Sequence, residues 1–347
     1  MEATTAAGLR VALAAVGIAV APGAAAQSGG AAAQSGGAAA QSGGAAAQSG
    51  QYPAKPIRLI VSSGAGGGLD FVARMIATPL GEALGQTVVA DNRPGASGSI
   101  AATIAAAAPP DGYTLMFMSA SLVVYGIVNK TPYDLQRDFV PVSQVSAAPY
   151  ILTVHPSLPV NSVKELIAYA KANPNKLNYA STGKASFAHL ATEFFATTTG
   201  VKLVHVPYKG VGAALSDLLS GQVQMSLFSM GSVYSQVRAK KLKALAIATR
   251  TRHKMAPEIP TMIEAGVPGY VVTQWHGMMA PRGTPPAIID RLHAEIVKAV
   301  HLPAVEKRLA LDGTEPIASS PKEFGAHIAA ERRQWAEVAK RANIRTN

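Results

Sequence analysis

A glycine-rich turn is the part of this sequence whose residue types and spacing are best suited to bind a ligand. Residues 62–68 read Ser-Ser-Gly-Ala-Gly-Gly-Gly and lie between the apolar run 57–61 and a helical pattern that starts at Leu69. The first N–H groups of a helix have no partner within it and carry the positive end of its dipole. Glycines let a ligand approach such groups closely. The turn therefore predicts an anion site at a helix start.

The spacing of the glycines argues against a nucleotide as this anion. The dinucleotide motif G-x-G-x-x-G would need a glycine where Leu69 stands, and a P-loop would need a lysine after its last glycine. A carboxylate fits better, because a few N–H groups and hydroxyls are enough to bind it. The alternative is a plain turn that only joins strand to helix. The predicted contacts are the hydroxyl or main-chain N–H groups of Ser62, Ser63, Gly66, Gly67 and Leu69.

Further candidate ligand contacts follow other predicted strands. Open α/β sheets bind ligands beyond the carboxyl ends of their strands, so polar residues at those ends are candidates. Asp70 is also a candidate, although an acid in a first helical turn favours the helix dipole and a structural cap is the stronger interpretation. The candidates at later strand ends are Ser119, Ser121, Ser181, Thr182, Gly183, Ser186, Tyr208 and Ser229.

Patterns for catalysis or metal binding are weak in this sequence. Residues 95–99 resemble the G-x-S-x-G motif, but their last two residues are exchanged. The histidines show no H-E-x-x-H spacing. We expect His189, Trp275 and His276 to pack within the fold rather than to contact a ligand. We therefore predict no enzymatic activity, no catalytic residue, no metal and no cofactor; a periplasmic hydrolase is the less favoured alternative.

The composition limits the partners of the chain. Its 347 residues carry a formal net charge of +11, but only 15% are charged, and the basic residues are dispersed without interleaved aromatics. This argues against nucleic-acid binding, and a general attraction of small anions is the simpler interpretation. The sequence has no cysteine, which excludes disulfides, thiolate metal sites and a lipid anchor on cysteine.

The N-terminus has the pattern of a secretory leader. Arg10 precedes an apolar stretch, residues 11–21, and Ala24-Ala25-Ala26 form a cleavage pattern before Gln27. We predict a signal peptide over residues 1–26 and export to the periplasm, with a short amphipathic anchor as the alternative. Residues 27–51 repeat an Ala/Gln/Ser/Gly unit of seven residues and are predicted to be a low-complexity linker.

From residue 56 onward, short apolar runs alternate with helical patterns. This alternation predicts an α/β fold with parallel sheets covered on both faces. Extended segments near 150 and 272 join two such blocks. We therefore predict two lobes with a cleft between them, connected by two crossings of the chain: residues 52–150 with 272–347, and residues 151–271.

Nine stretches of the sequence, in order, resemble the substrate-binding receptors of tripartite tricarboxylate transporters, also called the Bug family. The resemblance covers the chain from about residue 52 to the C-terminus. One departure stands at residues 62–65, where the family usually has Pro-Phe-x-Pro; this predicts a pocket that is wider, more hydrated or more flexible than is usual in the family. The matching stretches are residues 52–61, 66–70, 91–98, 111–115, 177–183, 206–210, 217–221, 259–266 and 280–285.

The resemblance implies a type II periplasmic-binding-protein fold (Venus flytrap), in which two α/β lobes joined by two crossing strands hold the ligand. It also implies a small organic carboxylate as ligand: a di- or tricarboxylate, an amino acid or an aromatic acid. The receptor would deliver this ligand to the membrane subunits of a tripartite tricarboxylate-type transporter, and we expect a monomer. A sensory receptor that docks to a signalling partner is the alternative.

Overall fold

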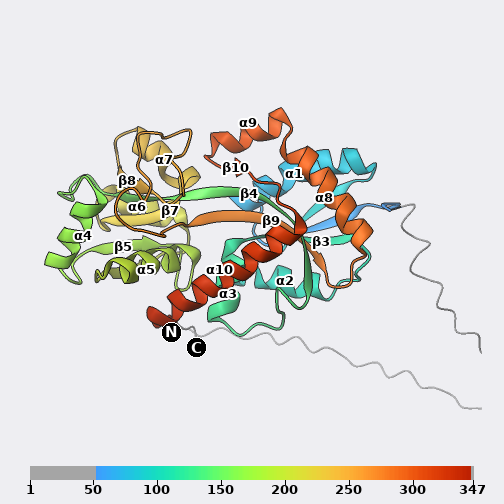
Figure 1. Ribbon diagram of the computed structural model, residues 1–347, viewed down its shortest axis with the longest axis horizontal. Coiled ribbons are helices and arrows are strands. Elements are labelled where there is room, and N and C mark those ends of the chain that lie inside the picture. The colour runs from blue at the N-terminus through green and yellow to red at the C-terminus, as the bar shows by residue number, and fades with distance from the viewer. Residues whose placement is uncertain (1–51, 345–347) are drawn as a thin grey trace, which may run out of the picture. The chain divides into compact units, whose positions relative to one another are not determined.

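The structure is a computed structural model that describes residues 52–344. The predicted signal peptide and linker lie outside the described residues. The strands join edge to edge in the order β2-β1-β3-β9-β4-β7-β5-β6, and β8 and β10 also pair with β4 (Figure 1). The strands are β1 (Ile57–Val61), β2 (Val88–Asn92), β3 (Thr114–Ser119), β4 (Phe139–Val154), β5 (Asn178–Ser181), β6 (Val204–Pro207), β7 (Met225–Ser229), β8 (Lys243–Ile247), β9 (Thr273–Pro281) and β10 (Glu315–Pro316).

Helices connect most of these strands. A short 3-10 turn, Ala96–Gly98, precedes α2. The helices are α1 (Gly68–Leu84), α2 (Ser99–Ala106), α3 (Ala120–Val128), α4 (Val163–Ala172), α5 (Phe187–Thr199), α6 (Val211–Ser220), α7 (Met230–Arg238), α8 (Pro286–Val300), α9 (Pro303–Leu311) and α10 (Pro321–Arg341).

The strands form two sheets that share β4. The first sheet contains the parallel strands β1, β2 and β3, and the second contains the parallel strands β5, β6 and β7. The first part of β4 pairs with β9, while its last residues, Tyr150 to Val154, pair with β7. Since β4 takes part in both, it carries the chain from the first sheet to the second.

The prediction of parallel sheets is wrong for β4 and β9. Strand β9 is antiparallel to both β3 and β4, and β4 is antiparallel to β7 and β8. These two strands lie between the two sets of parallel strands. On one side β9 is antiparallel to β3, and on the other side β4 is antiparallel to β7. Close to the predicted crossings, Tyr150 N donates to Val272 O at 3.2 Å and Val272 N donates to Ala248 O at 2.9 Å. The lobe boundaries themselves stay a prediction.

Apolar side chains are buried on both faces of the first sheet. In β1, Leu59 and Val61 belong to one hydrophobic cluster and Ile60 to another, and all three are fully buried. Strands buried on both faces read as continuous apolar runs, as β1 does. The fold thus holds the glycine-rich turn on a strand that is fixed from both sides.

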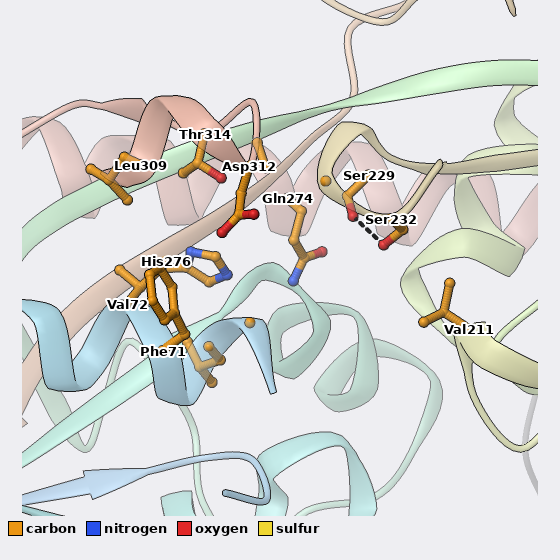
Figure 2. Close-up of a pocket in the computed structure, with 14 residues that line it drawn as sticks. Phe71, Val72, Val211, Ser229, Ser232, Gln274, His276, Leu309, Asp312 and Thr314 are labelled. Carbon is orange, nitrogen blue, oxygen red and sulfur yellow. Dashed lines mark hydrogen bonds between the residues drawn. The ribbon is translucent and has the colours of Figure 1, made fainter. Parts of the chain in front are cut away.

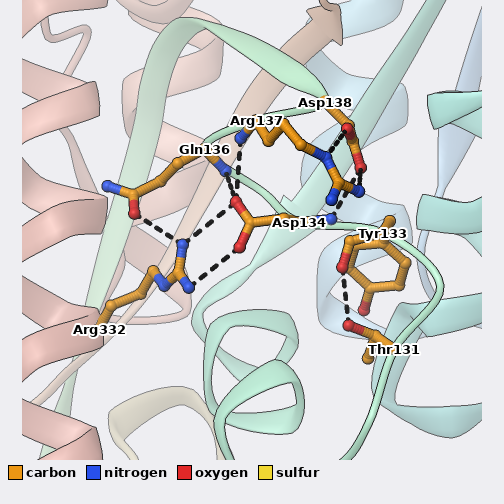
Figure 3. A network of polar contacts seen from close by, with 7 residues as sticks. All are labelled: Thr131, Tyr133, Asp134, Gln136, Arg137, Asp138 and Arg332. Atoms are coloured by element: carbon orange, nitrogen blue, oxygen red, sulfur yellow. Dashed lines mark hydrogen bonds and ion pairs between the residues drawn. The ribbon is translucent and has the colours of Figure 1, made fainter.

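The last long helix packs against parts of both sheets. Helix α10 contacts α3, β4 and α5, and Figure 1 shows it in red, crossing near α3 and β9. Its Arg332 donates to Gln136 Oε1 at 2.7 Å and to Asp134 Oδ2 at 3.1 Å (Figure 3). One turn further along, Trp335 meets Phe187 of α5 edge to face, with ring centroids 5.1 Å apart.

Most predicted elements agree with the structure, but some were missed. The apolar run 57–61 forms β1, and the helical pattern from Leu69 lies in α1. Elements α9 and β10 were not predicted, and Ser121, a candidate at a strand end, lies in α3. Helix α3 is rich in valine and isoleucine, which have low helix propensity and hide the helical pattern.

The described residues 52–344 belong to one compact unit. Over this range, no helix is both long enough and apolar enough to cross a membrane. Over the same range, no group of three or more His, Cys, Asp or Glu side chains could hold a metal ion.

Candidate functional site

A cavity of about 510 Å³ opens beside the N-terminus of α1 (Figure 2). Residues from both sheets contribute to its wall. They come from α1, β4, α6, the β7–α7 junction, β9, and the end of α9 with the segment after it. The lining residues are Gly68, Leu69, Phe71, Val72, Ala148, Val211, Ser229, Gly231, Ser232, Gln274, His276, Leu309, Asp312 and Thr314.

Three helices present their first turns to this cavity. Gly68 and Leu69 begin α1, Val211 begins α6, and Gly231 lies in the first turn of α7. No side chain of the described residues caps these three helices. Their first-turn N–H groups and their positive dipole ends are therefore available to an anion.

Three other helices, α4, α5 and α10, are capped by side chains, whereas α2, α3, α8 and α9 have no side-chain cap from the described residues either. The hydroxyls of Ser162, Ser186 and Ser320 accept hydrogen bonds from the first turns of α4, α5 and α10. At α7 the N-cap residue Ser229 instead shares a hydrogen bond of 2.9 Å with Ser232 Oγ, as Figure 2 shows. The cavity therefore has open helix ends, together with two hydroxyls that can bind a ligand.

Gln274 and His276 on β9 add polar groups to the cavity wall. Gln274 Nε2 lies 3.5 Å from Ser121 Oγ, and Gln274 Oε1 is buried without a hydrogen-bond partner among the described residues. A hydrogen bond of 3.0 Å joins His276 Nδ1 to the buried Ser146 Oγ. Burial lowers the pKa of His276 to about 4, so its ring is neutral near pH 7.

One side of the cavity is apolar. Leu69, Phe71 and Val72 of α1 and Leu309 of α9 form this side. The guanidinium group of Arg308 lies 4.6 Å from the centroid of the Phe71 ring, a cation–π contact that supports the ring. The cavity can therefore hold the apolar part of a ligand beside the groups that bind its anionic part.

Asp70 supports the glycine-rich turn from behind. Its carboxylate accepts hydrogen bonds from Gly66 N at 2.8 Å, Asn92 Nδ2 at 2.8 Å and Arg74 Nε at 2.9 Å. Burial raises the pKa of Asp70, but these hydrogen bonds outweigh it and leave the pKa below its usual value. Only 3% of Asp70 is exposed. The structure therefore places it as a structural partner of the turn.

The other predicted residues of the turn lie close by. Ser62 is buried against Gly98, Ser63 O accepts a hydrogen bond from Asn92, and Gly67 is the N-cap residue of α1. Of the residues predicted at the turn, Leu69 lines the cavity. The others lie close to Leu69 in the sequence but are not lining residues: Ser62, Ser63, Gly66, Gly67 and Asp70.

Of the candidates at later strand ends, Ser229 lines the cavity and Ser121 contacts the lining residue Gln274. Ser119 is the N-cap residue of α3. Tyr208 donates from its hydroxyl to Asp217 at 2.7 Å and is not a lining residue.

The predicted second-sheet turn lies outside the lining residues too. Ser181 Oγ is 2.6 Å from His205 Nε2 and bonds the main chain of Gly183, Thr182 is exposed, and Ser186 caps α5. His189 packs on His205, with ring centroids 3.8 Å apart. The polar groups of this turn are thus largely used within the fold.

Sequence reasoning missed several lining residues. Val211 and Asp312 stood in no recognised motif, and His276 was predicted to pack rather than to face a ligand. Trp275 does pack: it is fully buried and meets Phe324 edge to face at 5.3 Å. Because side chains alternate along a strand, His276, its neighbour on β9, faces the other way. This alternation is the signal that could have identified His276.

Comparison with known proteins gives consistent results. A family profile described as "Tripartite tricarboxylate transporter family receptor" matches residues 72–344. BugT of Bordetella pertussis is 39% identical over 292 residues, which are 83% of this chain and 90% of BugT.

Two solved structures of Rhodopseudomonas palustris proteins contain ligands. Rpa4515 with adipate is 37% identical to this chain and has a TM-score of 0.75. The match covers 85% of this chain and 99% of the Rpa4515 chain. MatC (Rpa3494) with bound malate is 31% identical to this chain and has a TM-score of 0.71. The match covers 83% of this chain and 99% of the MatC chain. The fold is the α/β fold of periplasmic binding proteins.

Proposed function

Since this chain belongs to the receptors of the tripartite tricarboxylate transporter family, we propose that it binds a small organic carboxylate in the cavity beside α1. The family and the matching structures are binding receptors. We accordingly propose that the protein holds its ligand without transforming it and needs no cofactor.

One observation carries this proposal: three helix first turns without side-chain caps face a single cavity. Those of α1, α6 and α7 converge there, and the hydroxyls of Ser229 and Ser232 lie beside them. Backbone N–H groups and helix dipoles can hold a carboxylate without a lysine or an arginine. The ligands of the two R. palustris structures, adipate and malate, are both carboxylates, which supports this assignment.

We further propose that the protein acts in the periplasm, after removal of the leader predicted over residues 1–26, and passes its ligand to the membrane subunits of a transporter. The leader pattern of the sequence and the membership of a transporter receptor family support this. The predicted monomeric state fits such a carrier.

A thermal-shift screen of mono-, di- and tricarboxylates tests the proposal, with ATP as the comparison anion. A ligand that binds only the folded state adds about 2.7 kcal/mol at a hundredfold excess over its Kd, which is on the order of 4–5 °C in Tm for a domain of this size. We expect at least one carboxylate to raise Tm and to be recovered unchanged. A shift with ATP but with no carboxylate would contradict the proposal.

A further inference from the structure

The charge of the cavity wall is unusual for a site that attracts anions. Among the residues of 52–344 that line the cavity there is no lysine and no arginine, and Asp312 is the single carboxylate. The one histidine, His276, is buried and neutral near pH 7. The formal side-chain charge of the wall is therefore negative, although the whole chain carries +11.

The position of Asp312 is fixed by its main chain. Asp312 follows α9 and precedes Gly313, which has a φ of +63°, a conformation that favours glycine. A Cβ atom on Gly231 would lie 2.8 Å from Asp312 O, so the two backbones are in close contact. This contact fixes the Asp312 segment against the first turn of α7.

The side chain of Asp312 has no structural role that would explain a carboxylate there. It forms no hydrogen bond or ion pair with any described residue, and Figure 2 shows it directed into the cavity between His276 and Gln274. An acid at the C-terminal end of a helix is unfavourable for that helix, because this end of the dipole is negative. The carboxylate is thus free to act on whatever occupies the cavity.

The apolar side of the cavity indicates what the ligand carries besides its carboxylate. Leu69, Phe71, Val72 and Leu309 offer no hydrogen-bonding side chain, so a hydrocarbon chain or ring gains most by lying against them. A second carboxylate on the ligand would lie in a cavity that already contains the charge of Asp312. Two like charges a few ångströms apart repel each other, and because Asp312 is exposed, water and salt screen part of this repulsion.

We infer, on the basis of the carboxylate-binding function proposed above, that the cavity selects ligands with a single carboxylate and an apolar body. Asp312 is the residue that determines this specificity, because it disfavours a second carboxylate. The helix first turns bind the one carboxylate, and the Leu69–Phe71–Val72–Leu309 side receives the body. This preference would distinguish the chain from Rpa4515, whose structure contains the dicarboxylate adipate.

Hexanoate and adipate test this inference, because the two have the same six-carbon chain and differ in the second carboxylate. Their Kd values are measured by calorimetry at pH 7.5 for the wild type, Asp312→Asn and Asp290→Asn. Asp290 is exposed on α8 and does not line the cavity, so its variant changes the total charge equally and serves as the matched control. Tm is measured for each variant to show that it is folded.

We expect the wild type to bind hexanoate about tenfold more tightly than adipate. This is the size expected of a screened repulsion between the Asp312 carboxylate and the second carboxylate of adipate. Asp312→Asn should reduce this ratio about fivefold or more by improving adipate binding, and Asp290→Asn should leave it unchanged. Equal or tighter binding of adipate by the wild type, or the same ratio in Asp312→Asn, would overturn the inference.

Failure of both hexanoate and adipate to bind would also overturn it. The proposed receptor function would still stand in that case, provided that another carboxylate of the thermal-shift screen binds. It would fall only if no carboxylate binds.

Discussion

At the scale of single residues, the polar groups that we propose for ligand binding are neutral. Ser229, Ser232 and Gln274 present hydroxyl and amide groups, and His276 presents a neutral ring held by Ser146. Neutral groups cost less to bury than charges do, so these residues can contact a ligand closely, and Asp312 remains the one charged side chain among the described lining residues. The burial that keeps His276 neutral also makes the stability of the protein depend on pH.

We predict that His276 weakens the fold as the pH falls. Its pKa is about 4 in the folded protein because of burial, whereas a histidine in an unfolded chain titrates near 6.5. Between these values the unfolded chain binds a proton that the folded protein does not. The free energy of unfolding should therefore fall as the pH drops from about 6.5 to about 4, by at most about 3 kcal/mol from this group.

Urea denaturation at pH 7.5 and 4.5 measures this effect. The loss between the two pH values should be smaller in His276→Gln than in the wild type, since the glutamine does not titrate. His301→Gln, which alters an exposed histidine, is the control and should behave like the wild type. An equal loss in the wild type and His276→Gln would show that His276 does not contribute.

At the scale of elements, α10 joins parts of the fold that are far apart in the sequence. Arg332 binds Asp134 and Gln136, which precede β4, and Trp335 packs on Phe187 of α5. Trp335 is fully buried, and its Nε1 donates to Glu331 Oε2 at 2.6 Å. The packing of Trp335 on Phe187 holds the centre of α10 against α5, whereas the Arg332 contact is partly exposed.

We predict that Trp335→Phe destabilises the protein by about 2–4 kcal/mol. The change leaves a cavity and removes the hydrogen bond to the buried Glu331. Arg332→Ala should cost less, about 0.5–1.5 kcal/mol, because Arg332 and Asp134 are each about one-third exposed and Gln136 is exposed. Chemical denaturation of both variants measures this difference, and a larger loss for Arg332→Ala would contradict the assignment of α10 packing to Trp335.

The sequence was informative where one local pattern decides the structure. The apolar run of β1 and the serine, proline and glutamate at the start of α10 each determine an element by themselves, and the glycine-rich turn does lead into a helix beside the cavity. Helix α3 was missed because its valines oppose helix propensity and only packing makes them helical. The direction of β9 was missed because pairing between distant strands leaves no local signal.

The site was predicted less completely than the fold for the same reason. Leu69 was found because it stands at the predicted helix start, and Ser229 because it follows a predicted strand. Asp312 and Val211 reach the cavity only through the packing of α9 and α6, which no spacing in the sequence reveals. Ser181 and Ser186 follow the expected strand–turn–helix pattern, yet their hydroxyls bond other groups of the fold: Ser181 bonds Gly183 and His205, and Ser186 accepts from His189 N.

At the scale of the whole molecule, the two sources of anion attraction are separate. The net charge of +11 draws anions from a distance, and in our proposal the open first turns of α1, α6 and α7 bind them in the cavity. Salt should therefore slow the association of a carboxylate more than it weakens the final complex. The central claim concerns the second source, the helix first turns.

Gly68→Val tests that claim most directly. A Cβ atom at Gly68 would meet no atom within 4 Å, so valine fits without strain and places its methyl groups where the ligand must approach the first turn of α1. Gly126→Val is the matched control, since Gly126 is equally free of neighbours and lies in α3, outside the cavity. Both variants are titrated by calorimetry with the carboxylate that gives the largest thermal shift.

We predict that Gly68→Val lowers the affinity about tenfold or more, as the loss of a few hydrogen bonds to the carboxylate implies, while Tm stays within a few degrees of the wild type. Gly126→Val should bind as the wild type does. Unchanged affinity in Gly68→Val would contradict the account, because the carboxylate would then lie away from the first turn of α1.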